Sequence, residues 1–143
     1  MVEKTPQEKL LALQLELEQI YLKLEAIKEE SALLGKYELE YTVTKTTIEN
    51  LKKVSLDEES LVPIGGGVYL KTKILDNEKV LMNVGAGVFI ETNIDDVIEK
   101  INKALENIQK RRKELTELSL ELSKRAEEVR SEIVKLTQSS NKG

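Results

Sequence analysis

Apolar residues recur at alternating spacings of three and four in two long stretches of this chain, one near each end. In the first stretch they are Leu10, Leu13, Leu17, Ile20, Leu24, Ile27 and Leu34. In the second, one series is Ile101, Ile108, Leu115, Leu122, Val129 and Leu136. The other is Ile98, Leu105, Arg112, Ser119, Ala126 and Ile133, and its two middle positions are polar. An average spacing of 3.5 residues is that of a coiled-coil seam. The pattern predicts two long helices, over residues 5–54 and 93–138, each of which needs a partner along one face.

The nearest partner for each helix is the other, so we expect an antiparallel hairpin with both chain ends far from the bend. Thr5-Pro6-Gln7-Glu8 has the form of a capping box at the first helix start. Beyond Leu34 the strict repeat would place Glu38 and Lys45 in the seam. We therefore expect a phase shift there. The residues expected to take over the seam are Tyr37, Tyr41, Thr44, Ile48 and Leu51.

The segment between the helices, residues 56–92, is an internal duplication. Residues 61–74, LVPIGGGVYLKTKI, are matched twenty residues later by residues 81–94, LMNVGAGVFIETNI. Short β-branched and aromatic runs on either side of glycines predict hairpins, with turns at Gly65 and Gly67 and at Gly85 and Gly87. Asp76-Asn77-Glu78-Lys79 supplies the turn between the two copies.

Two isolated hairpins offer little core, and their edges remain open for pairing. We expect matching strands from sister chains to close those edges into a barrel. The strand residues expected to make these contacts are Val62, Ile64, Val68, Leu70, Met82, Val84, Val88 and Ile90. The fold class is therefore α+β: one unit over residues 1–143, a long antiparallel coiled-coil hairpin with two β-hairpins at its bend that form an oligomeric β-barrel. Residues 139–143 are expected to be a frayed tail.

Composition narrows the function. The net charge is −4 and the charges are interspersed, so nothing favours nucleic acid as a partner. No apolar run approaches the ~20 residues that cross a bilayer, and a cytoplasmic protein is the expectation. Cysteine and histidine are both absent, which removes disulfides, thiolate nucleophiles, imidazole bases and nearly every zinc site. A charged fraction of 34% without cysteine is also typical of a thermophile.

No motif supports catalysis, a cofactor or a metal. The glycine runs lack the spacing of a phosphate-binding loop or a dinucleotide site and lead into strands, so turns explain them. The acidic clusters Asp57-Glu58-Glu59 and Asp95-Asp96 lack the spacing of a calcium loop, and surface or helix-start roles suit them better. We do not expect an enzyme.

The order helix, doubled glycine-valine-aromatic strand module, helix resembles the α-type subunit of archaeal prefoldin. The residues that carry the resemblance are VPIGGGVY, 62–69, and VGAGVFIE, 84–91. The resemblance implies a hetero-hexamer of two α-type and four β-type subunits, with a central double β-barrel and six projecting coiled coils. It also implies that the coiled-coil tips hold non-native polypeptides and deliver them, without ATP, to a group II chaperonin. A γ-type relative that assembles into filaments is similar to the α-type, and leaves a coiled-coil scaffold or filament subunit as the alternative.

Under this resemblance the apolar residues near the chain ends become candidates for client contact, because a coiled coil frays there and exposed apolar patches mark binding surfaces. The candidates are Leu10, Leu11, Leu13, Val129, Ile133 and Leu136. The alternative is that these residues only close the helix pair.

Overall fold

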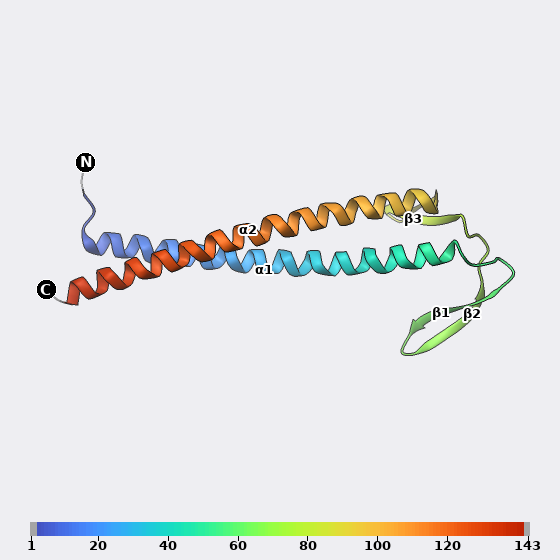
Figure 1. Ribbon diagram of the computed structural model, residues 1–143, viewed down its shortest axis with the longest axis horizontal. Helices are drawn as coiled ribbons and strands as arrows, with labels where there is room; N and C mark the ends of the chain where they lie inside the picture. The colour runs from blue at the N-terminus through green and yellow to red at the C-terminus, as the bar shows by residue number, and fades with distance from the viewer. Residues whose placement is uncertain (1–2, 142–143) are drawn as a thin grey trace. The chain divides into compact units, whose positions relative to one another are not determined.

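The computed structural model describes residues 3–141, which form two long helices and four strands in the order α1, β1, β2, β3, β4, α2 (Figure 1). The chain divides into two compact units. The terminal unit combines α1 up to Lys36 with α2 from Gln109 onward, and the central unit runs from Tyr37 to Ile108. A single unit over residues 1–143 stays a prediction.

Helix α1 spans Pro6–Leu51. The predicted capping box is confirmed: the backbone N–H of Glu8 donates to Thr5 Oγ1 at 3.2 Å, and the N–H of Thr5 donates to Glu8 Oε2 at 3.4 Å. The helix ends three residues before the expected residue 54. It ends there because the N–H groups of Lys53 and Val54 close tighter turns onto carbonyls three residues back.

Helix α2 spans Ile94–Asn141 and begins directly after the last strand. Its first N–H, that of Ile94, donates to the carbonyl of Glu78 at 2.8 Å, so the loop before β3 satisfies one of the free amides of the helix start. The helix continues past residue 138, where the sequence predicted its end, because no glycine or proline interrupts residues 139–141. The remainder of the expected tail, residues 142 and 143, lies outside the described residues.

Each copy of the duplicated segment is a β-hairpin, as predicted. Strands β1, Glu59–Gly65, and β2, Val68–Lys73, form one antiparallel two-stranded sheet. Strands β3, Lys79–Gly85, and β4, Val88–Asn93, form the other. Both pairings have a register shift just before the turn, at Pro63/Gly65 and at Asn83/Gly85. The two sheets are separate, and the expected oligomeric barrel stays a prediction.

The helices pack antiparallel within each unit. In the terminal unit Ile20 of α1 packs with Ala126 and Val129 of α2, and the start of α1 lies beside the end of α2 (Figure 1). In the central unit Ile48 packs with the first turns of α2. The strand residues Val80 and Met82 pack against this second cluster, whereas no β1 or β2 residue belongs to it. The second hairpin is therefore anchored on the helices through its first strand.

The expected phase shift in α1 is seen only in part. Ile48 is buried and Leu51 packs against its cluster, as expected, whereas the other three expected residues stay exposed. Tyr37 and Tyr41 are exposed, while Glu38 and Lys45 are half-buried and Ile48 is buried. Two charged positions of the strict heptad, Glu38 and Lys45, are thus partly covered, although Tyr41 on the same repeat is exposed. Long charged side chains tolerate this placement because their aliphatic stems cover the seam while their charged ends reach water. Sequence patterning alone favours the apolar tyrosines and misses this property of the stems.

Candidate functional site

The two hairpins present an apolar face made by the residues predicted to contact sister chains. Val62 lies opposite Leu70, and Met82 lies opposite Ile90. Because side chains alternate between the two sides of a strand, these pairs share a face with the apolar residues two positions along. Leu70 is 50% exposed and Ile90 is 42% exposed. Met82 alone among the eight predicted strand residues is half-buried. Within the described chain this face is largely uncovered.

The opposite face of each hairpin is also partly apolar, which the sequence analysis missed. Leu61 and Tyr69 on the first hairpin and Leu81 and Phe89 on the second are all more than half exposed. These residues alternate along the strands with the predicted ones, so the alternation of side chains between the two faces would have identified them. A sheet that is apolar on both sides needs cover on both sides.

The outer edge of each strand is unpaired as well. Each sheet has only two strands, so each strand has one edge whose N–H and C=O groups have no strand partner within the sheet. Such edges are templates for pairing with another chain. Open edges and exposed apolar faces together make the hairpins the candidate surface for assembly.

The six residues expected to contact clients occupy different environments in the terminal unit. Val129 is 0% exposed and belongs to the core with Ile20. Leu13 and Ile133 pack against that core. Leu11 points away from it and is 57% exposed. Leu10 and Leu136 are half-buried. A contact through Val129 would require the helices to separate, whereas Leu11 is accessible as the chain stands.

Two of the six residues line an open groove between the start of α1 and the end of α2. The groove, called here the terminal groove, has a volume of about 400 Å³. It is lined by Lys4, Lys9, Ala12, Leu13, Glu132, Lys135 and Leu136. The sequence does not predict that its lysines lie together, because only the register between the helices brings Lys9 and Lys135 to one groove. The groove offers apolar surface with a charged rim.

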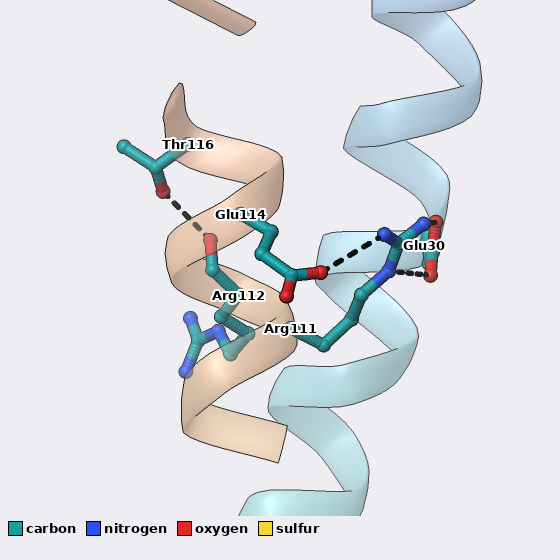
Figure 2. A network of polar contacts seen from close by, with 5 residues as sticks. All are labelled: Glu30, Arg111, Arg112, Glu114 and Thr116. Atoms are coloured by element: carbon teal, nitrogen blue, oxygen red, sulfur yellow. Dashed lines mark hydrogen bonds and ion pairs between the residues drawn. The ribbon is translucent and has the colours of Figure 1, made fainter. Parts of the chain in front are cut away.

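Two arginine–glutamate pairs join the helices of the terminal unit. Arg125 donates from Nε and Nη2 to the two carboxylate oxygens of Glu16 at 2.6 and 3.0 Å. Arg111 makes the same two-pronged contact with Glu30 at 2.8 and 3.1 Å (Figure 2). The donated hydrogen bonds lower the pKa of both Glu16 and Glu30 and raise the pKa of both arginines. Two-pronged pairs of this kind are geometrically specific.

A third arginine joins the helices through an aromatic ring. Arg130 donates from Nε to Tyr21 Oη at 2.7 Å, and its guanidinium carbon lies 5.3 Å from the centre of the ring. The hydrogen bond to Tyr21 is the main cause of a raised pKa at Arg130. Together the three arginines hold the helices of the terminal unit in one register.

Within residues 3–141, no three or more His, Cys, Asp and Glu side chains gather so as to hold a metal ion. Neither helix, over the same residues, has the length and apolar content that crossing a bilayer demands. The distinctive surfaces of the described chain are thus the hairpin faces and the terminal groove.

Comparison with known proteins identifies the family. Residues 20–139 match the prefoldin subunit family. A prefoldin subunit alpha 1 from Methanocaldococcus jannaschii is 36% identical over 100 residues, which cover 67% of this chain and 68% of that protein. A prefoldin subunit alpha 1 from Thermococcus kodakarensis is 35% identical over 105 residues, covering 73% and 70% respectively.

A solved structure supports the same fold. A chain in the cryo-EM structure of filamentous PFD from Methanocaldococcus jannaschii matches with a TM-score of 0.68. The match covers 83% of this chain and 98% of that chain at 19% identity, which establishes likeness of fold. The family match, the sequence relatives, the two long helices and the doubled hairpin agree. The chain belongs to the prefoldin subunit family, as an α-type member.

Proposed function

We propose that this chain is a subunit of an ATP-independent holdase that works in the cytoplasm. It assembles through its hairpins with β-type subunits into a hexamer of two α-type and four β-type chains. The ends of its helices hold non-native polypeptides and pass them to a group II chaperonin. Two features together carry the proposal. The hairpins have exposed apolar faces. An apolar groove lies between residues near the start of α1 and residues near the end of α2.

Family membership supports a chaperone role, and the chemistry of the surfaces supports this mode of action. The terminal groove is open, so each contact with a client is weak. Several copies of such a groove in one assembly would bind by avidity, which needs no deep pocket. Release then needs no nucleotide, because weak contacts dissociate readily when a chaperonin competes.

The second candidate is a scaffold or filament subunit of the γ-type kind. The observation that favours it is the match to a chain of a filamentous prefoldin. The same hairpin faces and open edges would then join copies of this chain to one another.

Native mass spectrometry with and without a β-type subunit separates the two candidates. A stable six-chain complex that forms only with the β-type subunit supports the holdase subunit. Open-ended homo-oligomers that form without the β-type subunit and do not bind it would support the scaffold instead.

Client contact is tested by suppression of aggregation of a denatured reporter protein. We expect Leu11→Ser with Leu136→Ser to weaken suppression, because both changes remove apolar surface at the chain ends. Leu120→Ser is the matched control, since Leu120 is 67% exposed on α2 and lies outside the terminal groove. Undiminished suppression by the double variant, with assembly intact, would remove these residues from the client site.

A further inference from the structure

We propose that the terminal groove selects non-native segments in which an apolar residue is flanked by acidic side chains. This inference rests on the proposed holdase function and names the class of client segment that the site prefers. It is carried by the charge of the groove, which differs from that of the outward side of α1.

The floor of the groove is apolar. Ala12 and Leu13 contribute from α1 and Leu136 from α2, and all three are half-buried. A floor of this size accommodates the side chain of a leucine or a similar residue. Burial of that side chain would supply the main attraction, at about 25 cal/mol for each Å² removed from water.

The rim of the groove is basic. Lys4, Lys9 and Lys135 surround the floor, against a single acidic residue, Glu132. Glu132 Oε1 lies 3.8 Å from Arg125 Nη1, so its charge is already partly balanced. The three lysines are exposed, and none has an acidic partner among the described residues. These lysines are therefore free to pair with acidic groups on a bound segment.

The unpaired lysines stand out against the arginines of the same unit. Arg111, Arg125 and Arg130 each bind a group on the opposite helix, so their charges serve the helix pair. The three groove lysines serve no such contact. At the start of α1 the side chains of Thr5 and Glu8 accept hydrogen bonds from each other's backbone N–H groups. The side chains of Lys4 and Lys9 take no part in this cap.

The outward side of α1 has the opposite charge. Leu11, Leu15 and Leu22 are exposed there, and Glu18 is exposed among them on the same side of the helix. An acidic segment would be repelled from this side and attracted to the groove. The charge pattern thus both favours one class of segment and directs it to one place.

Three labelled peptides test the proposal on the full chain purified alone, so that no other subunit contributes a binding end. They share a leucine core and differ only in flanking residues: aspartate, asparagine or lysine. Fluorescence anisotropy measures their affinities. At low salt we expect the aspartate peptide to bind about ten-fold more tightly than the lysine peptide, as a few exposed charge pairs allow. The difference should shrink in high salt, because screening weakens exposed pairs.

Substitution of the rim identifies the residues responsible. We expect Lys4→Gln, Lys9→Gln and Lys135→Gln together to abolish the preference for aspartate while the asparagine peptide still binds. The matched control is Lys23→Gln, Lys110→Gln and Lys124→Gln, which changes the net charge equally at exposed lysines outside the groove. The control should keep the preference, and helical circular dichroism verifies that both triple variants are folded.

The outcomes distinguish this inference from the proposed function. Equal affinities for the three peptides, or tighter binding of the lysine peptide, would overturn the inference. If the chain still suppressed aggregation, the proposed holdase function would stand. Loss of preference in the control variant as well would also overturn it, because net charge and not the groove would then be responsible. Failure of every peptide to bind, together with no suppression of aggregation, would overturn both.

Discussion

Ala86 has a backbone conformation that residues other than glycine rarely adopt. Its φ is +52°, and the equivalent residue of the first hairpin, Gly66, has a φ of +59°. Both belong to two-residue turns in which the next residue, Gly67 or Gly87, also has positive φ, as tight hairpin turns require. The second hairpin has one compensation: the N–H of Gly85 donates to Asn83 Oδ1 at 2.9 Å. The first hairpin has Pro63 in the place of Asn83 and cannot make this bond.

Exchange of alanine and glycine at these two turns should have opposite effects. We expect Ala86→Gly to stabilise the second hairpin and Gly66→Ala to destabilise the first, each by roughly 1 kcal/mol, since the left-handed conformation costs an L-residue about that much. No heavy atom lies within 4 Å of a Cβ added at Gly66, so the effect is one of backbone conformation alone. Amide hydrogen exchange of the strand residues measures it.

Gly35 provides the control for that exchange. It lies within α1, and an added Cβ would meet only Arg112 Nη2, at an ordinary 3.9 Å. We expect Gly35→Ala to stabilise the helix by about 0.5–1 kcal/mol, because alanine has the higher helix propensity. Destabilisation at both Gly35 and Gly66 would show that added volume, and not the sign of φ, decides the result.

At the scale of elements, the period of the apolar residues predicted both helices, and the duplicated β-branched and aromatic runs with their glycines predicted both hairpins. Leu115 and Ile108, at the unbroken seam position of α2, are buried as that period requires. Period alone failed where the seam becomes polar, because the burial of Glu38 and Lys45 depends on the length of their stems. It also could not reveal which end residues are accessible. Val129 and Leu11 are both apolar and both near a chain end, yet one faces the partner helix and the other faces solvent.

The contacts between the helices of the terminal unit predict a dependence on pH. The arginines lower the pKa of Glu16 and Glu30 in the folded chain from a usual value of 4.5. A carboxylate with a lowered folded pKa stabilises the fold above its unfolded pKa, and that contribution is lost as the pH falls through the folded pKa. We expect the melting temperature of the helices, followed by circular dichroism, to fall as the pH drops below about 4.5.

Removal of these two carboxylates should flatten that acid dependence. We expect Glu16→Gln with Glu30→Gln to lower the melting temperature near neutral pH and to reduce its fall in acid. The effect should be small, because all four side chains of the two pairs are at least 40% exposed. Glu18→Gln with Glu29→Gln is the control, since both residues lie exposed on α1 without an arginine partner. An unchanged acid slope in the first variant would mean that other carboxylates control it.

At the scale of the whole molecule, the hairpins leave apolar surface that contact with sister chains would cover. The helices bury their seams against each other within each unit, but the strands bury little of their apolar surface. Two-stranded sheets are marginal in water unless another layer or further strands cover them. The duplication doubles the strand surface without adding a core, so assembly is the most direct way to remove that surface from water.

Neighbouring substitutions test which face of the hairpins takes part in assembly. We expect Leu70→Asn with Ile90→Asn to weaken assembly at least ten-fold, because burial of a leucine or isoleucine side chain contributes about 1.5–3 kcal/mol. Lys71→Asn with Glu91→Asn is the matched control: it places the same new residue one position along each strand, on the opposite face, and leaves the net charge unchanged. Sedimentation velocity measures the oligomer, and circular dichroism confirms that the helices persist. Equal loss of assembly in both variants would mean that contact runs through the strand edges or through both faces together. An oligomer unaffected by the first variant would mean that the helices, and not the hairpins, join the chains.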